Sequence, residues 1–326
     1  MTRTHRETAD SADATVMSRR QVIGAGTTLI AASLITGTGA RPLLAATAAN
    51  TFKVGEAEMT VLSDGRFTLP LSFVLPGRDE ADVVKLFATE GLKFSTIVAE
   101  TNVTIVKHAG RTVLIDTGAG PDFMPTLGKL TENLEAAGIK AASVTDVVFT
   151  HAHADHFWGV LDPFGDESLF ANARHVMSDH ERNFWLSAGV ESRVPDMQKQ
   201  MAVGIVRRLK QLGDRIGVVK GDAEIAPGIS LFPTPGHTPG HVSVAVRSKN
   251  EELVVVGDAL TQSIVSFAAP GWRWGADMDA DAAIATRNKL LDRLTADKSR
   301  IVGYHFPAPG IGRVEKVGSA YRFRPA

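Results

Sequence analysis

The chain has 326 residues, of which 44% are hydrophobic and 22% are charged, and its formal net charge is −1. A chain of this length and composition buries a sizeable core and is neither disordered nor fibrous, and a near-neutral charge balance without a local basic stripe argues against nucleic-acid binding. Because the chain has no Cys, it forms no disulfide, and any metal ion must be held by His and carboxylate side chains.

The first 48 residues resemble a twin-arginine export signal. Arg19 and Arg20 directly precede a mildly apolar stretch, residues 22–38, and the small side chains of residues 46–48 offer a cleavage site. The stretch is shorter than the roughly 20 strongly apolar residues that a membrane span requires. We therefore expect the twin-arginine export machinery to recognise residues 1–48, and the protein to be periplasmic or secreted once they are removed.

The remaining residues, 49–326, alternate strand and helix patterns without a linker or a repeat, and this predicts a single domain. A helix is expected over about 127–137 and another over about 280–294. Strands are expected over residues 103–107, 111–115, 146–150, 229–232, 242–246, 253–256 and 301–304. This interleaving predicts an α/β fold in which two mixed β-sheets pack face to face with helices outside, an αββα sandwich.

A dense group of metal-ligating side chains follows the predicted strand 146–150. His151 and His153 share one face of an extended chain, and Asp155 and His156 follow in the turn. Four desolvated polar groups this close together would be costly without a cation, so the segment predicts part of a two-metal site. Such nitrogen and oxygen ligands suit Zn, and also Fe, Mn or Co.

His237, Asp258 and His305 are the candidates for the remaining ligands, because each lies at the end of a later strand. A turn rich in Pro and Gly holds His237 in a fixed direction. Asp258 can supply the anionic bridge that two cations about 3.5 Å apart require, although a helix cap is the alternative. His241, which opens the next strand, has either a supporting or a structural role.

These residues resemble the motif of the metallo-β-lactamase superfamily, an αββα sandwich with a two-metal site. The motif's positions correspond to His151, His153, Asp155, His156, His237, Asp258 and His305. Further segments resemble the methyl parathion hydrolases and their lactonase and arylesterase relatives over nearly the whole chain after the signal, namely 116–120, 125–130, 184–187, 309–312 and 318–323. That resemblance also implies a homodimer.

The resemblance implies a metal-dependent hydrolase. A hydroxide bridging two divalent ions, with Zn favoured and Mn, Fe or Co as alternatives, would attack an ester, a lactone or a phosphotriester. Asp155 is then a metal ligand and proton acceptor, and Asp258 is the bridge. The alternative function is a redox metalloenzyme on the same fold, with iron-dependent oxygen or sulfur chemistry. A β-lactamase of the common kind is disfavoured because it uses a Cys ligand.

Three aromatic side chains are expected at the mouth of the substrate pocket. Phe123 follows the 116–120 turn, Trp158 follows the metal-binding motif, and Trp185 lies in the segment that resembles the family's substrate wall. An apolar wall of this kind favours a small-molecule substrate with an apolar or aromatic group beside the scissile bond. The alternative is that these aromatics only pack in the core or at its rim.

Overall fold

The structure is a computed structural model that describes residues 49–162 and 167–326. The twin-arginine signal predicted over residues 1–48 lies outside the described residues and, like the homodimer, stays a prediction. In the part of the chain that is described, no helix combines the length and the apolar character needed to span a bilayer.

The first half of the chain forms a mixed seven-stranded sheet in which the strands lie side by side in sequence order. The strands are β1 (Asn50–Val54), β2 (Ala57–Leu69), β3 (Ile97–His108), β4 (Arg111–Ile115), β5 (Asp146–Val148), β6 (Arg174–Ser178) and β7 (Ile216–Val219). Strands β1 to β4 pair antiparallel, and β4 to β7 pair parallel. Parallel neighbours point their carboxyl ends to the same edge, so the segments that follow β4, β5 and β6 start from that edge.

The second half forms another seven-stranded sheet, again in sequence order. Its strands are β8 (Glu224–Ala226), β9 (Ile229–Pro233), β10 (Val242–Ser248), β11 (Glu251–Val255), β12 (Arg300–Val302), β13 (Ile311–Val317) and β14 (Ala320–Pro325). Only β11 and β12 pair parallel. The expected sandwich of two mixed sheets is therefore confirmed.

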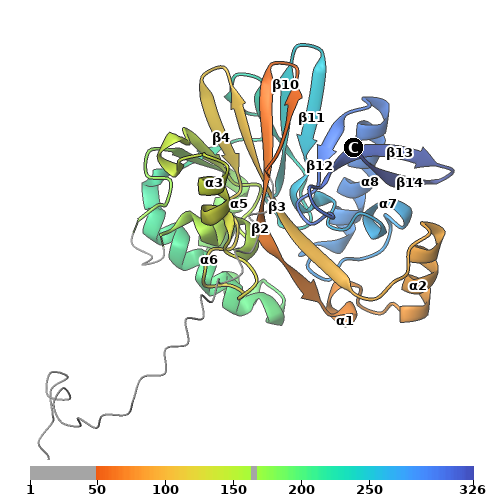
Figure 1. Cartoon of the computed structure of the whole chain (residues 1–326). Coiled ribbons are helices and arrows are strands. Elements are labelled where there is room, and N and C mark those ends of the chain that lie inside the picture. The colour runs from red at the N-terminus through yellow and green to blue at the C-terminus, as the bar shows by residue number, and fades with distance from the viewer. Residues whose placement is uncertain (1–48, 163–166) are drawn as a thin grey trace, which may run out of the picture. The chain divides into compact units, whose positions relative to one another are not determined.

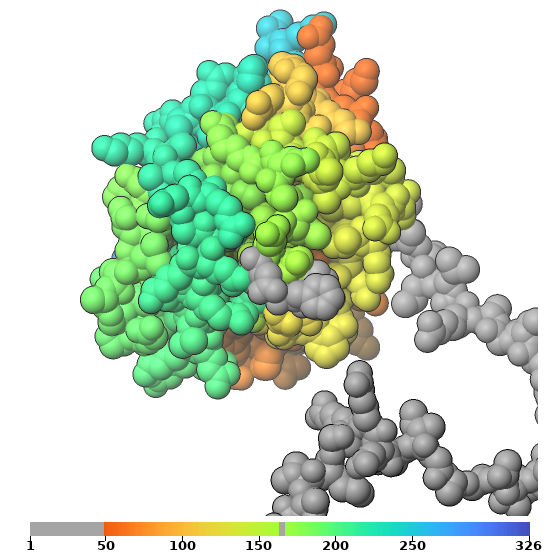
Figure 2. Space-filling model, turned by 90° about the vertical axis from the view of Figure 1, so that its left-hand side faces the viewer, coloured from red at the N-terminus to blue at the C-terminus, as the bar shows by residue number. Residues whose placement is uncertain are grey.

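Helices cover the outer faces of both sheets (Figure 1). Helices α3 (Leu130–Ala136), α5 (Asp179–Leu186) and α6 (Lys199–Leu212) lie beside the first sheet, and α7 (Val265–Ala268) and α8 (Ala280–Ala296) lie beside the second. Figure 2 shows the outer face on the side of the first sheet, where the segment from α3 to α6 covers most of the surface. The remaining helices are α1 (Leu71–Val74), α2 (Glu80–Thr89) and α4 (Ala154–Phe157), with 3-10 turns at 141–143, 158–160, 190–192, 196–198, 213–215 and 257–259.

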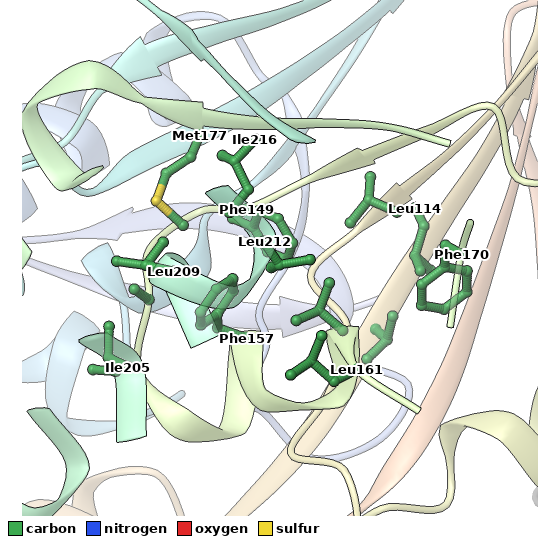
Figure 3. Packing of buried hydrophobic residues seen from close by; sticks show 14 of the residues in the cluster. Leu114, Phe149, Phe157, Leu161, Phe170, Met177, Ile205, Leu209, Leu212 and Ile216 are labelled. Carbon is green, nitrogen blue, oxygen red and sulfur yellow. The ribbon is translucent and has the colours of Figure 1, made fainter. Parts of the chain in front are cut away.

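The period of two along each strand sorts the apolar residues into three layers. Val113 and Ile115 of β4 face the other sheet and pack with Val255 of β11. Leu114, between them, faces outward toward the helices. On the other side Val254 packs under α8. Figure 3 shows the outer layer of the first sheet, where the side chains of α6 meet aromatic residues of the segment that follows β5.

Several element boundaries differ from those expected. Strand β5 ends at Val148 and β12 at Val302, each about two residues early. After β5 the chain turns because Thr150 donates its N–H to the Asp116 carboxylate rather than to a neighbouring strand. After β12, Tyr304 accepts the Asn102 N–H on its carbonyl, outside the ladder. Both strands thus stop just before a metal-ligating side chain.

Candidate metal centre

Four strand ends bring the candidate ligands to one place. Strand β5 leads into His151 to His156, β9 leads to His237, β11 leads to Asp258 and β12 leads to His305. All seven residues are buried, with at most 8% of the surface of any of them exposed. Their ligand atoms form three overlapping groups, within each of which all atoms lie within 4.8 Å of one another: His151, His153 and His237; His151, His156 and Asp258; and Asp155, His156 and His305.

Two of these groups share no residue, and Asp258 lies between them. We refer to His151, His153 and His237 as the three-imidazole group, and to Asp155, His156 and His305 as the carboxylate-containing group. Asp258 Oδ2 lies 3.1 Å from Nε2 of His237 and 3.3 Å from Nε2 of His305. A carboxylate that contacts ligands of both groups can be shared by two cations.

The imidazoles are oriented through the ring nitrogen that faces away from the centre. His156 Nδ1 lies 2.8 Å from the Asp116 carboxylate, and His237 Nδ1 lies 3.0 Å from the Asp277 carboxylate. His305 donates its Nδ1–H to the Glu100 carbonyl at 2.8 Å. These contacts fix the tautomer and leave Nε2 of each ring facing the centre, which is the usual support for metal-bound histidines.

Several buried polar atoms at the centre have no hydrogen-bond partner among the described residues. They are Nε2 of His151, His153 and His156, and Oδ1 of Asp258. Buried polar atoms are normally paired, because an unpaired one costs about 1–3 kcal/mol. His156 Nε2 and Asp258 Oδ1 lie 3.3 Å apart, and His153 places its other ring nitrogen, Nδ1, 2.9 Å from His237 Nε2. Unpaired buried ligand atoms among imidazoles and carboxylates this closely spaced are what a site for cations requires, so the residues present fit two divalent metal ions.

The charge distribution supports the same conclusion. Burial lowers the pKa of His151 and His153 well below the ordinary value, and neighbouring imidazoles add to this effect. At His156 burial also opposes protonation, but three carboxylates, that of Asp258 foremost, outweigh it and raise the pKa well above the ordinary value. Asp258 likewise outweighs burial and raises the pKa of His305. The carboxylates therefore create a negative potential that bound cations can neutralise.

His241 supports the centre without belonging to any ligand group. Its Nε2 accepts the backbone N–H of Asp258 at 2.9 Å, so the opposite nitrogen carries the proton and donates to Thr234 Oγ1 at 2.8 Å. Burial lowers its pKa to about 3, and the charge of His237 adds to this effect. Of the two roles left open by the sequence, the contacts of His241 match the supporting one.

Sequence reasoning did not identify Asp116, Asp277 or Glu181 as functional, although all three contact ligands or ligand-bearing loops. Asp116 gave a weak signal, because it directly follows a predicted strand in a glycine-rich turn. In the structure it has φ +63°, in the left-handed region. Asp277 and Glu181 gave none, since each lies about 30 or more residues from the nearest ligand it supports.

A cavity of about 310 Å³ opens onto the centre. His153, Asp155, His237, Asp258 and His305 form its polar floor, and the rest of the lining is mostly apolar. Met197, at the rim, is 74% exposed.

The three predicted pocket aromatics have different positions. Phe123 lines the cavity. Trp158 is absent from the lining and lies behind Phe123, with ring centroids 5.7 Å apart, and the Arg208 guanidinium lies over its ring, 4.1 Å from the centroid. Trp185 is completely buried, so the expectation that it forms a substrate wall is corrected. Its ring packs 6.1 Å from that of His153 and its indole N–H donates to Glu181.

Comparison with known proteins links this centre to a family. A family model described as the metallo-beta-lactamase superfamily matches residues 97–305, from β3 to the last candidate ligand. The chain is similar to the solved structure of AidC, described as a dizinc quorum-quenching lactonase in complex with a product, with 28% identity, a TM-score of 0.80 and coverage of 85% of this chain and 97% of AidC. It is also similar to AbOPH, described as a hydrolase in the beta lactamase superfamily, with 26% identity, a TM-score of 0.78 and the same coverage of both chains.

Among curated sequences the chain is similar to the N-acyl homoserine lactonase AiiB of Agrobacterium fabrum, with 28% identity over 200 residues. That alignment covers 52% of this chain and 66% of AiiB. An N-acyl homoserine lactonase of a Bacillus species is 21% identical over 180 residues, which is 62% of its length. The chain thus spans about two thirds or less of the length of these curated relatives.

Proposed function

The chain belongs to the metallo-beta-lactamase superfamily, and on that premise we propose that it is a metal-dependent hydrolase of lactone and ester bonds, with N-acyl homoserine lactones as the first candidate substrates. The observation that carries the proposal is the convergence of seven buried ligands in two groups around Asp258, at the floor of an apolar cavity. The similarity to AidC and AiiB supports the choice of substrate. The redox alternative is not favoured, because the relatives described here are named as hydrolases.

The three-imidazole group would hold one divalent ion and the carboxylate-containing group the other, with Asp258 shared. We propose zinc, since AidC is described as a dizinc enzyme and these ligand types suit zinc. When bound, two such ions polarise the scissile carbonyl group and lower the pKa of a water molecule at the centre.

The side chains of this protein supply proton transfer and positioning. Asp155 lies in the cavity lining, and its Oδ2 is 3.3 Å from His305 Nε2, so this carboxylate is placed to take a proton at the floor of the cavity. Phe67 and Phe123 meet edge to face at 6.4 Å beside it. These rings and the neighbouring apolar residues can hold an acyl chain and exclude water from it.

Phosphotriesters are the second candidate substrates. Stabilisation of charge on the attacked oxygen serves a phosphorus centre as well as a carbonyl carbon, and the Phe67–Phe123 pair offers an aromatic surface for an aryl leaving group.

The deciding experiment is an assay of the zinc-loaded protein with N-acyl homoserine lactones of increasing chain length, aryl esters and phosphotriesters, accompanied by elemental analysis. We expect about two zinc ions per chain, kcat/KM highest for the lactones and rising with acyl length, and loss of turnover when a chelator removes the metal. A protein that binds two ions but hydrolyses none of the three classes would overturn the proposal, as would one that binds none.

A further inference from the structure

Glu181 is a buried carboxylate in the first turn of α5, outside the ligand set. Its side chain is fully buried, and in the described part of the chain no ion pair offsets its charge. A buried carboxylate without a cation is costly unless several donors satisfy it, so its partners need an explanation.

Four donors surround the two carboxylate oxygens. Oε1 accepts the backbone N–H of Ala152 at 2.9 Å and the indole N–H of Trp185 at 2.7 Å. Oε2 accepts the hydroxyl of Thr238 at 2.7 Å and the backbone N–H of Gly240 at 3.1 Å. Each of the two carboxylate oxygens therefore accepts two hydrogen bonds, and all four donors are uncharged groups.

Three of the four donors belong to the two loops that carry the three-imidazole group, and the fourth, Trp185, lies on α5 with Glu181 itself. Ala152 lies between His151 and His153, on the loop that leaves the first sheet. Thr238 and Gly240 follow His237, on the loop between β9 and β10 of the second sheet. Glu181 thus hydrogen-bonds to two ligand loops from different sheets, next to the backbone hydrogen bond in which Val242 N–H donates to the Thr150 carbonyl at 3.0 Å.

The packing around Glu181 leaves little freedom for either loop. A Cβ added to Gly240 would lie 2.0 Å from the backbone nitrogen of Glu181, so the start of α5 rests directly on the second loop. On the other side, Trp185 packs its ring against that of His153 while donating to Glu181. A displacement of Glu181 would therefore be transmitted to both loops.

We propose that Glu181 is a positioning residue that holds His151, His153 and His237 in register and thereby sets the affinity of the three-imidazole group for its metal ion. The inference rests on the proposed two-metal site. Glu181 makes no hydrogen bond to Asp155, His156 or His305, and two of its four donors, Thr238 and Gly240, lie on the His237 loop, which carries no residue of the carboxylate-containing group. Its contribution should therefore be larger for the metal position of the three-imidazole group than for the other.

Replacement of Glu181 by Gln tests this selectivity with almost no change in shape. The amide NH2 cannot face Ala152 and Trp185, because both of those partners are N–H donors. It must face Thr238 and Gly240, where the Thr238 hydroxyl can turn to accept but the Gly240 N–H loses its acceptor. The E181Q variant should therefore disturb the loop that carries His237.

The measurement is a zinc titration of the metal-free protein in competition with a chromophoric chelator, which resolves two binding equivalents. We expect E181Q to bind one equivalent about 10–100-fold more weakly than the wild-type protein, and the other within about threefold. Thr238→Ala removes one donor and should weaken the same equivalent by roughly 2–10-fold; it decides the question if E181Q does not fold.

Asp146→Asn is the matched control. Asp146 is equally buried and binds Arg111 and Arg174 at the far end of β5, away from the ligand loops. The Asp146→Asn variant should have a lower melting temperature than the wild-type protein and the same affinity for both zinc equivalents. Equal weakening of both equivalents in E181Q and Thr238→Ala, or no weakening in either, would overturn the role of Glu181. A wild-type protein that binds fewer than two equivalents would instead overturn the proposed function.

Discussion

The two ligand groups of the centre are supported in different ways. The three-imidazole group contains no carboxylate, and buried carboxylates stand behind it: Asp277 behind the His237 ring and Glu181 behind the loops. The carboxylate-containing group has its own negative charge in Asp155, whose backbone carbonyl accepts the Tyr304 hydroxyl at 2.6 Å. It also has a buried carboxylate behind it, that of Asp116 at 2.8 Å from His156 Nδ1. The neutral ligand set thus depends entirely on charge placed behind it, whereas the other set combines such charge with a carboxylate of its own.

The largest expected effect comes from the residue that both groups share. Asp258→Ala removes the only side chain that contacts both His237 and His305 among the described residues. We expect turnover to fall by about 10³-fold or more, because several kcal/mol of charge stabilisation are lost. Metal content should fall below two ions per chain, as measured by elemental analysis. Two retained ions with unchanged turnover would show that the groups work independently of Asp258.

The next largest effect distinguishes Asp116, which supports His156 of the carboxylate-containing group, from Asp277, which supports His237 of the three-imidazole group. Asp116→Asn replaces the acceptor of His156 Nδ1 and of the Thr150 N–H by an amide, at a positive φ that Asn tolerates. We expect metal affinity to fall about 10–100-fold with little loss of folding stability. Asp277→Asn also leaves Arg287, which is 2% exposed, without its ion-pair partner, so it should additionally destabilise the fold by about 3–5 kcal/mol.

Zinc titration and urea unfolding of the two variants distinguish these outcomes. If Asp116→Asn lowers the free energy of unfolding as much as Asp277→Asn does, then Asp116 and Asp277 do not differ in their contribution to folding stability, and the contrast drawn here is wrong.

The contiguous part of the centre could be predicted from sequence, because the spacing of His151, His153, Asp155 and His156 is set locally by a strand and a turn. His237, Asp258 and His305 could also be selected, since each lies at or just past a strand end. Their convergence could not be derived from periodicity alone, because it depends on how the two sheets pack. The superfamily resemblance supplied that step.

The supporting residues and the pocket could not be predicted in the same way. Glu181 and Asp277 become informative only when distant loops meet around them. The resemblance of residues 184–187 to the family's substrate wall predicts a pocket position for Trp185, but tertiary packing decides which side of a helix faces a cavity and which faces the core. The layered fold was predictable because the period of two along β4 and β11 is visible in the sequence.

The smallest expected effect concerns a buried imidazole outside both groups. His175 is 2% exposed and its Nε2 lies 2.8 Å from Ser168 Oγ, with no carboxylate behind it. Burial lowers its pKa from 6.5 to about 4, and the charge of Arg215 adds to this effect. Because the folded-state pKa is the lower one, the contribution of His175 to stability is complete above pH 6.5 and is lost as the pH falls toward 4.

Between pH 7 and pH 5 this loss amounts to about 2 kcal/mol. The His175→Gln variant keeps a polar group near Ser168 but has no imidazole to protonate, so it should not show this loss of stability. In urea unfolding of the metal-free proteins, the difference in free energy of unfolding between wild type and variant should therefore be about 2 kcal/mol smaller at pH 5 than at pH 7. Zinc affinity should be the same in both, because His175 touches neither ligand group. An unchanged difference between the two pH values would mean that His175 is protonated in the folded protein, and that burial without a carboxylate does not keep an imidazole neutral in this fold.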